Sequence, residues 1–430
     1  MTSPMTPATP TWIERMTLHR WYAISGDRPE LGLPPTASGT RYLVDTDPAR
    51  DPLLNPPRTI KERLRRIAGR EPSSPWHGVV GFSAITEGWN GAAYASRYGA
   101  SGSMIAFGGG HDDYFGSDVH AFDLASREWR RIADGYVAGG DAQYGAGARY
   151  PDSVYPDGSP LPPHTYDYVQ YDPVGNDYIL FKGQTELGPK VKAIAIAHLF
   201  NLDTLAWRHG PRHPTAILNA GGWTTWDESR RLVWGHSGDD GGGNAFIGFS
   251  PDGDNADGSS GHWSERYPNK LPGVANHNAM QIDPRGHIIV VSVHAHDGLY
   301  AIDPADPGRE IVRLVSAGCK PALQPYAAMQ YARNMDRLVY FSPLDRGVVY
   351  SIAAPEGRAW RDNVAAPWTW HGHAPAADTL DPIHDAASRS RYALHRAQTF
   401  GRFRIASFGA IDLAVLVRHI DTPVYAMRLT

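Results

Sequence analysis

Short apolar stretches, separated by glycine, proline and aspartate, follow one another along most of the chain. The clearest example is residues 103–132, where the apolar run 104–107 ends at three consecutive glycines. An extended pattern resumes at 119–122, and Trp129 marks a further strand. Because glycine adopts backbone conformations that side chains forbid, the glycines predict a hairpin connection. The segment therefore predicts three consecutive strands of one antiparallel sheet, with a histidine, His111, at the turn.

The same order of strands recurs six times between residue 81 and the C-terminus. The copies begin at WNGAAYAS (89–96), HTYDYVQYDP (164–173), GGWTTWDES (221–229), HNAMQIDP (277–284), PYAAMQYAR (325–333) and GRFRIASF (401–408). Repeats of about 50 residues that each hold four strands are typical of β-propeller blades. We predict an all-β propeller with six blades. The spacing is uneven, with extra segments at about 134–163 and 372–401, which leaves a degenerate seventh blade open.

The segment 18–25, LHRWYAIS, reads as an outer strand without the three strands that should precede it. An N-terminal strand that completes the last blade would close the ring and remove a free sheet edge. We therefore expect a flexible leader over 1–17 and one propeller domain over 18–430. Within that domain, 18–25 is the closing strand, 26–80 an irregular insertion with a short helix at 59–68, and 81–430 the blades.

Composition narrows the choice of partner. The net charge of −4 gives no basic footprint for nucleic acid, and no apolar run is long enough to cross a membrane. Cys319 is the single cysteine, which excludes an intramolecular disulfide. The N-terminal residues lack the basic start and apolar core of a signal peptide. We expect a monomer without nucleic-acid or membrane partners, and its localisation stays open.

In a four-stranded antiparallel blade, the connection between the second and third strands lies on the same face as the connection between blades. We call this the histidine face and the opposite one the turn face. Histidines, aromatic residues and amides on such loops suit the binding of a sugar chain. The binding residues predicted to converge on the histidine face are Trp89, Asn90, Tyr114, His164, Gln184, His236, His277, Asn278, His294 and Tyr326.

The motifs WNGAAY, FGGGHDDYFGSDVHAFDL, PPHTYD, GRFRIASF and PVYAMRL resemble bacterial kelch-type propellers. Among enzymes they most resemble the propeller ulvan lyases, which are polysaccharide lyases. The resemblance implies β-elimination in a uronic-acid-containing, ulvan-like polysaccharide, with His111 and Tyr166 as base and acid. It also implies an acidic polysaccharide as partner, no required cofactor, and a secreted or periplasmic location. The family expects an arginine against the substrate carboxylate, whereas this chain offers Lys182.

The implied chemistry is coherent with these residue types. Removing the C5 proton of a uronate builds charge next to a carboxylate, so a cation must neutralise that group. Lys182 can do so as a point charge. Gln184 and His164 can add hydrogen bonds. Alternative carboxylate clamps expected on the histidine face are Arg149, Arg212 and Arg333.

Two other functions compete with this interpretation. A non-catalytic kelch propeller could bind glycan or protein through the same face, and the residue list suits both. A structural or catalytic metal ion also stays open, because His236, His277 and His294 could converge with Gln184. A copper oxidase of the galactose-oxidase kind is disfavoured, since Cys319 lacks the sequence pattern of a cysteine linked to a ligand tyrosine.

Overall fold

The computed structural model describes most of the blades and the start of the chain. The described residues are 7–27, 29–36, 85–86, 89–109, 117–134, 153–184, 193–213, 221–236, 245–265, 267–268, 279–286, 288–292, 298–306, 311–323, 327–342, 345–355, 365–383, 399–418 and 422–430. Within them, no helix has the length and apolarity required to span a bilayer. The expected helix at 59–68 lies outside the described residues.

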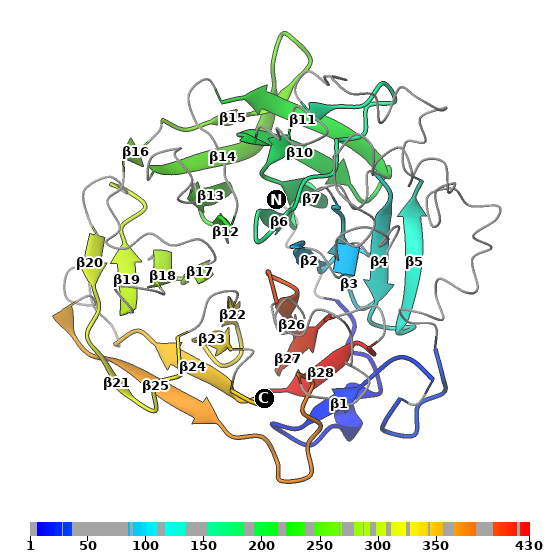
Figure 1. The fold of residues 1–430 in the computed structure, drawn as a ribbon, viewed down its shortest axis with the longest axis vertical. Helices are drawn as coiled ribbons and strands as arrows, with labels where there is room; N and C mark the ends of the chain where they lie inside the picture. The colour runs from blue at the N-terminus through cyan, green and yellow to red at the C-terminus, as the bar shows by residue number, and fades with distance from the viewer. Residues whose placement is uncertain are drawn as a thin grey trace, which may run out of the picture.

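Six antiparallel sheets of four or five strands stand in a ring, as predicted (Figure 1). The first strand of each sheet lies next to the axis, and these strands contact one another around the ring in the order β2, β6, β12, β17, β22, β26 and back to β2. No seventh blade occurs among the described residues. The fold is therefore a six-bladed β-propeller.

The first three blades follow the predicted copies. Blade 1 holds β2 (Ala92–Ala95), β3 (Ser103–Ala106), β4 (Val119–Asp123) and β5 (Glu128–Ala133). Blade 2 holds β6 (Val169–Asp172), β7 (Asp177–Leu180), β10 (Ile196–Asn201) and β11 (Ala206–Arg212), with a small extra sheet of β8 (Gly183–Gln184) and β9 (Ala193–Ile194). Blade 3 holds β12 (Trp223–Asp227), β13 (Leu232–His236), β14 (Ala245–Asp254) and β15 (Ser260–Trp263), and β16 (Tyr267–Pro268) pairs with β14.

The last three blades repeat the pattern. Blade 4 holds β17 (Ala279–Ile282), β18 (Ile288–Ser292), β19 (Gly298–Ile302) and β20 (Ile311–Arg313). Blade 5 holds β22 (Ala328–Ala332), β23 (Arg337–Phe341), β24 (Val349–Ala353) and β25 (Trp368–His373), and β21 (Ser316–Gly318) adds to β25 in parallel. Blade 6 holds β26 (Phe403–Phe408), β27 (Ile411–Leu416), β28 (Tyr425–Arg428) and, as its outer strand, β1 (Trp21–Ala23).

The N-terminal strand closes the ring, as the sequence predicts. Trp21 pairs with Met427 and Ala23 with Tyr425 in antiparallel register. The segment before β1 forms a single 3-10 turn, η1 (Ile13–Arg15). This arrangement pairs the free edge of β28 and ties the two ends of the chain together.

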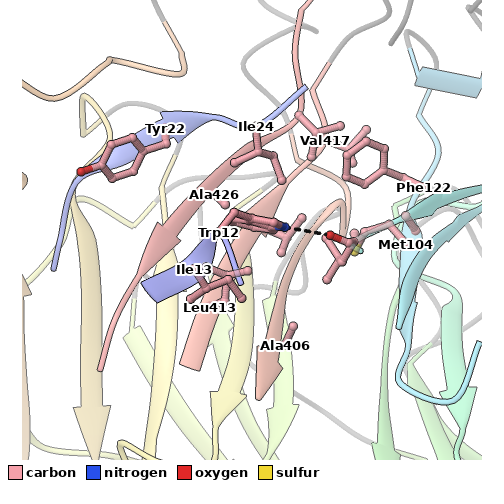
Figure 2. Packing of buried hydrophobic residues seen from close by; sticks show 14 of the residues in the cluster. Trp12, Ile13, Tyr22, Ile24, Met104, Phe122, Ala406, Leu413, Val417 and Ala426 are labelled. Carbon is pink, nitrogen blue, oxygen red and sulfur yellow. Dashed lines mark hydrogen bonds between the residues drawn. The ribbon is translucent and has the colours of Figure 1, made fainter. Parts of the chain in front are cut away.

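A hydrophobic cluster fills the wedge between the closing blade and blade 1 (Figure 2). Trp12 and Ile13 from the N-terminal segment pack against Leu413 and Ala426 of blade 6 and against Phe122 of blade 1. The Trp12 indole Nε1 donates a hydrogen bond to the Leu124 carbonyl at 3.1 Å. The N-terminal segment thus joins the last blade to the first through packing as well as strand pairing.

Candidate functional site

Strand direction gathers residues from two neighbouring blades on the histidine face. Trp89 and Asn90 lead into β2, and His164 and Tyr166 lead into β6. Lys182 follows β7, on the same face as the inter-blade connections. The structure therefore brings together five residues that the sequence assigned to this face.

Lys182 lies between two tyrosine rings of blade 2. Its Nζ is 4.9 Å from the ring centroid of Tyr166 and 5.7 Å from that of Tyr168. The same ammonium donates a hydrogen bond to the His164 carbonyl at 3.4 Å. Cation–π contacts of this kind hold an ammonium close to aromatic faces. The predicted cation and the predicted tyrosine are thus direct neighbours.

A chain of rings extends from this lysine across three blades. The ring centroids of Trp89 and His164 are 4.7 Å apart, and those of His164 and Tyr166 are 5.8 Å apart. Tyr166 meets Phe400, which precedes β26, edge-on at 6.1 Å. The sequence analysis did not single out Phe400. The signal that could have found it is its place directly before GRFRIASF, which matches the place of Tyr166 before the inner strand of blade 2.

Tyr166 and Phe400 share an uncommon backbone conformation. Their φ angles are 46° and 43°, in the left-handed region that side chains other than glycine seldom enter. Each follows the first residue of a tight turn, closed by Tyr168 N–H to the Thr165 carbonyl at 2.8 Å in one case and Arg402 N–H to the Thr399 carbonyl at 2.6 Å in the other. Strained residues of this kind concentrate at functional sites.

Gly91 allows the three blades to meet closely. A Cβ atom at this position would lie 2.2 Å from the Tyr166 carbonyl oxygen and 2.6 Å from that of Phe400. Hydrogen bonds fix the approach, because Tyr166 N–H donates to the Trp89 carbonyl at 2.7 Å and Thr165 N–H to the Asn90 side chain at 3.0 Å. The two strained aromatic residues therefore lie against the chain of blade 1.

Blade 6 supplies a second buried cation beside the rings. The guanidinium of Arg402 lies 5.8 Å from the Phe400 ring centroid and donates to the carbonyls of Asn90 and Val417. Burial, with a smaller effect from Arg418, lowers the pKa of Arg402 to about 9. Because its donors bind the carbonyls of Asn90 and Val417, Arg402 joins the chain of blade 6 to that of blade 1.

Asp167, directly after Tyr166, is a buried carboxylate. Its Oδ1 accepts a hydrogen bond from Arg404 Nη2 at 2.8 Å. Burial raises the pKa of Asp167 to about 6, although the nearby Arg404 charge lowers it. Carboxyl groups with raised pKa values are candidates for acid–base roles. The direct partner of Asp167 is Arg404, which links blades of the fold. We therefore assign Asp167 a structural role, in which it supports the turn that carries Tyr166.

The cluster formed by Trp89, His164, Tyr166 and Lys182 is largely buried. The exposed fraction is 7% for His164, 7% for Tyr166 and 6% for Lys182, while Trp89 is half-buried. Among these four residues, Trp89 is therefore the most accessible to solvent.

His236 lies one blade away and is part of the core. Its ring stacks on Trp223 at 4.6 Å and meets Phe246 at 4.8 Å, and it has no exposed surface. The Tyr168 hydroxyl donates to the His236 carbonyl at 3.4 Å, which links this pair to the lysine. Contact between His236 and a substrate stays a prediction.

Several predicted residues lie outside the described part of the chain. They are His111, Tyr114, Arg149, His277, Asn278, His294 and Tyr326. Gly109, two residues before His111, donates its N–H to the Pro163 carbonyl at 3.3 Å, next to His164. Gln184 pairs with Ala193 through the backbone of β8. In the described part of the chain, no group of three histidine, cysteine or acidic side chains could hold a metal ion.

Two of the arginines expected as alternative partners of the substrate carboxylate, Arg212 and Arg333, lie on opposite faces of the ring. Arg212 ends β11 at the histidine face and is exposed. Arg333 was misplaced by the sequence analysis, because it directly follows β22, the first strand of blade 5, and the turns after first strands lie on the opposite face. There it forms an ion pair with Glu228 at 3.5 Å. Arg333 therefore cannot clamp a substrate held at Tyr166.

No protein-family model and no curated protein sequence matches the chain. A solved structure similar in fold is the α-L-arabinanase of Penicillium chrysogenum complexed with arabinobiose. The two share 11% sequence identity over 79% of this chain and 92% of that one, with a TM-score of 0.43. At this identity the likeness says nothing of the reaction or substrate, so the lyase and kelch resemblances stay predictions.

Proposed function

We propose that the protein is a polysaccharide lyase that acts on a uronic-acid-containing chain at the histidine face. The observation that carries the proposal is the position of Lys182, whose ammonium lies 4.9 Å from the ring centroid of Tyr166. A cation next to a tyrosine supplies the two elements that elimination beside a carboxylate needs. The cation neutralises the substrate carboxylate, and the tyrosine exchanges a proton with the substrate.

The proposed reaction needs no water. A base removes the proton at C5, the electrons form the C4=C5 double bond, and the bond from C4 to the glycosidic oxygen breaks. An acid returns a proton to that oxygen, so the products are a shortened chain and an unsaturated uronate. Tyr166 and His111 share the base and acid roles, and Lys182 stabilises the charge that develops at the carboxylate.

The burial of the cluster favours a second candidate function. Tyr166, Lys182 and His164 pack against one another and keep little exposed surface. If these three residues serve only the packing of the fold, the half-buried Trp89 is the residue that contacts a ligand. The propeller then binds a glycan or a protein without cleaving it.

A single assay separates the two functions. The purified protein is incubated with ulvan, alginate, polygalacturonate and glycosaminoglycans, and the unsaturated product is followed by its ultraviolet absorbance. We expect turnover of at least one polymer, with kcat lowered about 10²-fold or more in Lys182→Met. Tyr166→Phe and His111→Ala should each abolish it.

Tyr331→Phe is the matched control, because this tyrosine lies on the turn face and its hydroxyl bonds Asp336. Folding of each variant is checked by circular dichroism. Turnover that survives in both Tyr166→Phe and Lys182→Met would contradict the assigned residues. Binding of a polymer without any unsaturated product, by folded wild-type protein, would support the second function.

A further inference from the structure

A cavity of about 850 Å³ opens at the turn face of the ring. It is lined by the second halves of the axial strands and the turns that follow them, and its wall includes Gln170, Gln281, Gln330, Tyr171, Trp226 and Tyr331. The volume lies within the range of about 300–1,000 Å³ that is usual for small-molecule sites. A cavity of this size can hold a ligand of two or three sugar units.

This cavity is separate from the cluster on the histidine face. Its wall contains neither Tyr166 nor Lys182. Arg404 is the link between the two regions, since it lines the cavity and bonds Asp167, the residue after Tyr166. A ligand in the cavity would therefore touch none of the residues proposed for elimination.

Three glutamines of the wall occupy matching places in blades 2, 4 and 5, one position before Tyr171, Ile282 and Tyr331. Each side-chain amide donates its N–H to a nearby carbonyl. The partners are Thr224 for Gln170 at 3.0 Å, Ile282 for Gln281 at 3.1 Å and Met329 for Gln330 at 2.7 Å. With the nitrogens held by the protein, the carboxamide oxygens are the atoms left to accept hydrogen bonds from a ligand.

Four of the five charged side chains of the wall form ion pairs within the protein, and the fifth, Asp283, is buried. Asp227 bonds Arg230 at 2.8 Å, and Glu228 pairs with Arg333 at 3.5 Å. Hydrogen bonds from Ser229, Arg230 and Trp234 outweigh the effect of burial and lower the pKa of Asp227, which keeps this carboxylate ionised and matched to its arginine. Arg404 is matched by Asp167. A charged ligand would have to compete with these pairs, whereas an uncharged one would not.

We propose that this cavity is a binding site for a short, uncharged saccharide. Hydroxyl groups of the ligand donate to the oxygens of Gln170, Gln281 and Gln330, and its sugar rings lie against Trp226 and Tyr331. Aromatic walls with a few placed polar groups are the usual composition of such sites. The site is independent of the proposed lyase activity, because it differs in face, in residues and in the charge of its ligand.

The test is isothermal titration calorimetry of the full chain with cellotriose, maltotriose and xylotriose. Trigalacturonate and spermidine serve as acidic and cationic comparisons. We expect at least one neutral trisaccharide to bind. Binding should weaken at least tenfold in Gln281→Met/Gln330→Met, which keeps the side-chain length and removes the acceptor oxygens. Glu128→Met, on the outer strand of blade 1, should bind like the wild type.

A second variant covers the case in which the double variant does not fold. Gln330→Trp narrows the cavity from one wall and should abolish binding. Tyr166→Phe should leave neutral saccharide binding intact, which separates this site from the histidine face. The proposal is overturned if none of the neutral trisaccharides binds, if only trigalacturonate or spermidine binds, or if neutral binding is unchanged in the folded glutamine variants.

Discussion

Arg404 of blade 6 and Asp167 of blade 2 form a buried ion pair, and Arg404 also bonds the first strand of blade 1. Arg404 Nη2 lies 2.8 Å from Asp167 Oδ1, and its Nε donates to the Ala92 carbonyl of β2 at 2.6 Å. The same guanidinium reaches the Val169 carbonyl of β6 at 3.2 Å. One side chain therefore ties three blades together at the strained turn that carries Tyr166.

Replacing Arg404 by methionine should destabilise the fold in a pH-dependent way. Removing one partner of a buried pair costs about 3–5 kcal/mol. Burial already raises the pKa of Asp167 to about 6, and loss of Arg404 raises it further. Below the unfolded pKa of 3.8, the Asp167 carboxyl is neutral in both the folded and the unfolded protein. As pH rises from there through the folded pKa, the unfolded state releases this proton first, so the favourable contribution of Asp167 to the free energy of unfolding is lost. The defect should thus be larger at about pH 8 than at about pH 5.

Urea denaturation at the two pH values measures this effect. Asp167→Asn/Arg404→Met is the control, because it removes the buried charge together with its partner. We expect the double variant to be more stable than Arg404→Met at the higher pH. An equal loss of stability at both pH values would show that Arg404 acts through packing alone.

The sequence predicted the blades because their strands follow local rules. Alternating apolar runs, the glycines after Phe107 and the tryptophan in five of the six outer strands are visible within short windows. The closing strand was predicted for the same reason, since Trp21 has the pattern of an outer strand. Strand direction also assigned Tyr166 to the histidine face, and the family resemblance added Lys182 to the same candidate site.

What the sequence did not predict depends on contacts between distant residues. Arg404 and Asp167 are 237 positions apart, and nothing near either residue marks the other as its partner. Arg333 was assigned to the wrong face, because it directly follows the first strand of blade 5 and the turn after a first strand lies opposite the histidine face. The cavity was missed because its glutamines occupy one position in each of three blades, and no single repeat shows that they converge.

Trp12 should contribute strongly to stability, because it joins the first and last blades (Figure 2). Trp12→Ala removes a buried indole and its hydrogen bond to Leu124, which we expect to cost about 3–5 kcal/mol. Trp12→Phe keeps most of the packing and should cost less. Thermal unfolding measures both, with Leu18→Ala, an exposed residue of the same segment, as the control. A loss no larger than that of Leu18→Ala would exclude a role in ring closure.

His198 should make stability fall at acidic pH. Its Nδ1 lies 2.7 Å from His209 Nδ1, and His209 Nε2 donates to the Gly158 carbonyl at 2.8 Å. With that donor fixed, a neutral His209 accepts the proton of His198 Nδ1. Burial, with a smaller effect from His209, lowers the pKa of His198 well below 6.5. Its contribution is therefore present above the unfolded pKa and is lost as pH falls below it.

His198→Asn tests this effect, because an amide nitrogen can replace the Nδ1 donor but does not titrate. Between about pH 7.5 and about pH 5, the wild type should lose more unfolding free energy than the variant. The difference is limited to about 1.4 kcal/mol per pH unit for one proton. Urea denaturation across this range measures it. Parallel pH profiles for the two proteins would show that His198 is not the titrating group.

Gly91→Ala should disturb the histidine face from blade 1. The added Cβ would meet the carbonyl oxygens of Tyr166 and Phe400 at 2.2 and 2.6 Å, and neither can move without changing a strained turn. Overpacking of this kind costs about 1–3 kcal/mol. Because the turn of Tyr166 must shift, turnover of the polysaccharide substrate should fall together with stability.

Gly248→Ala is the matched control for that variant. The nearest atom to its added Cβ is a ring carbon of Trp234 at 3.2 Å, a side chain that can adjust. We expect it to lose less stability than Gly91→Ala and to keep its polysaccharide turnover, since β14 contributes no ring to the chain of Trp89, His164, Tyr166 and Phe400. Both variants are compared by thermal unfolding and by the elimination assay. Equal effects of the two substitutions on stability and turnover would show that the approach of blade 1 does not position Tyr166.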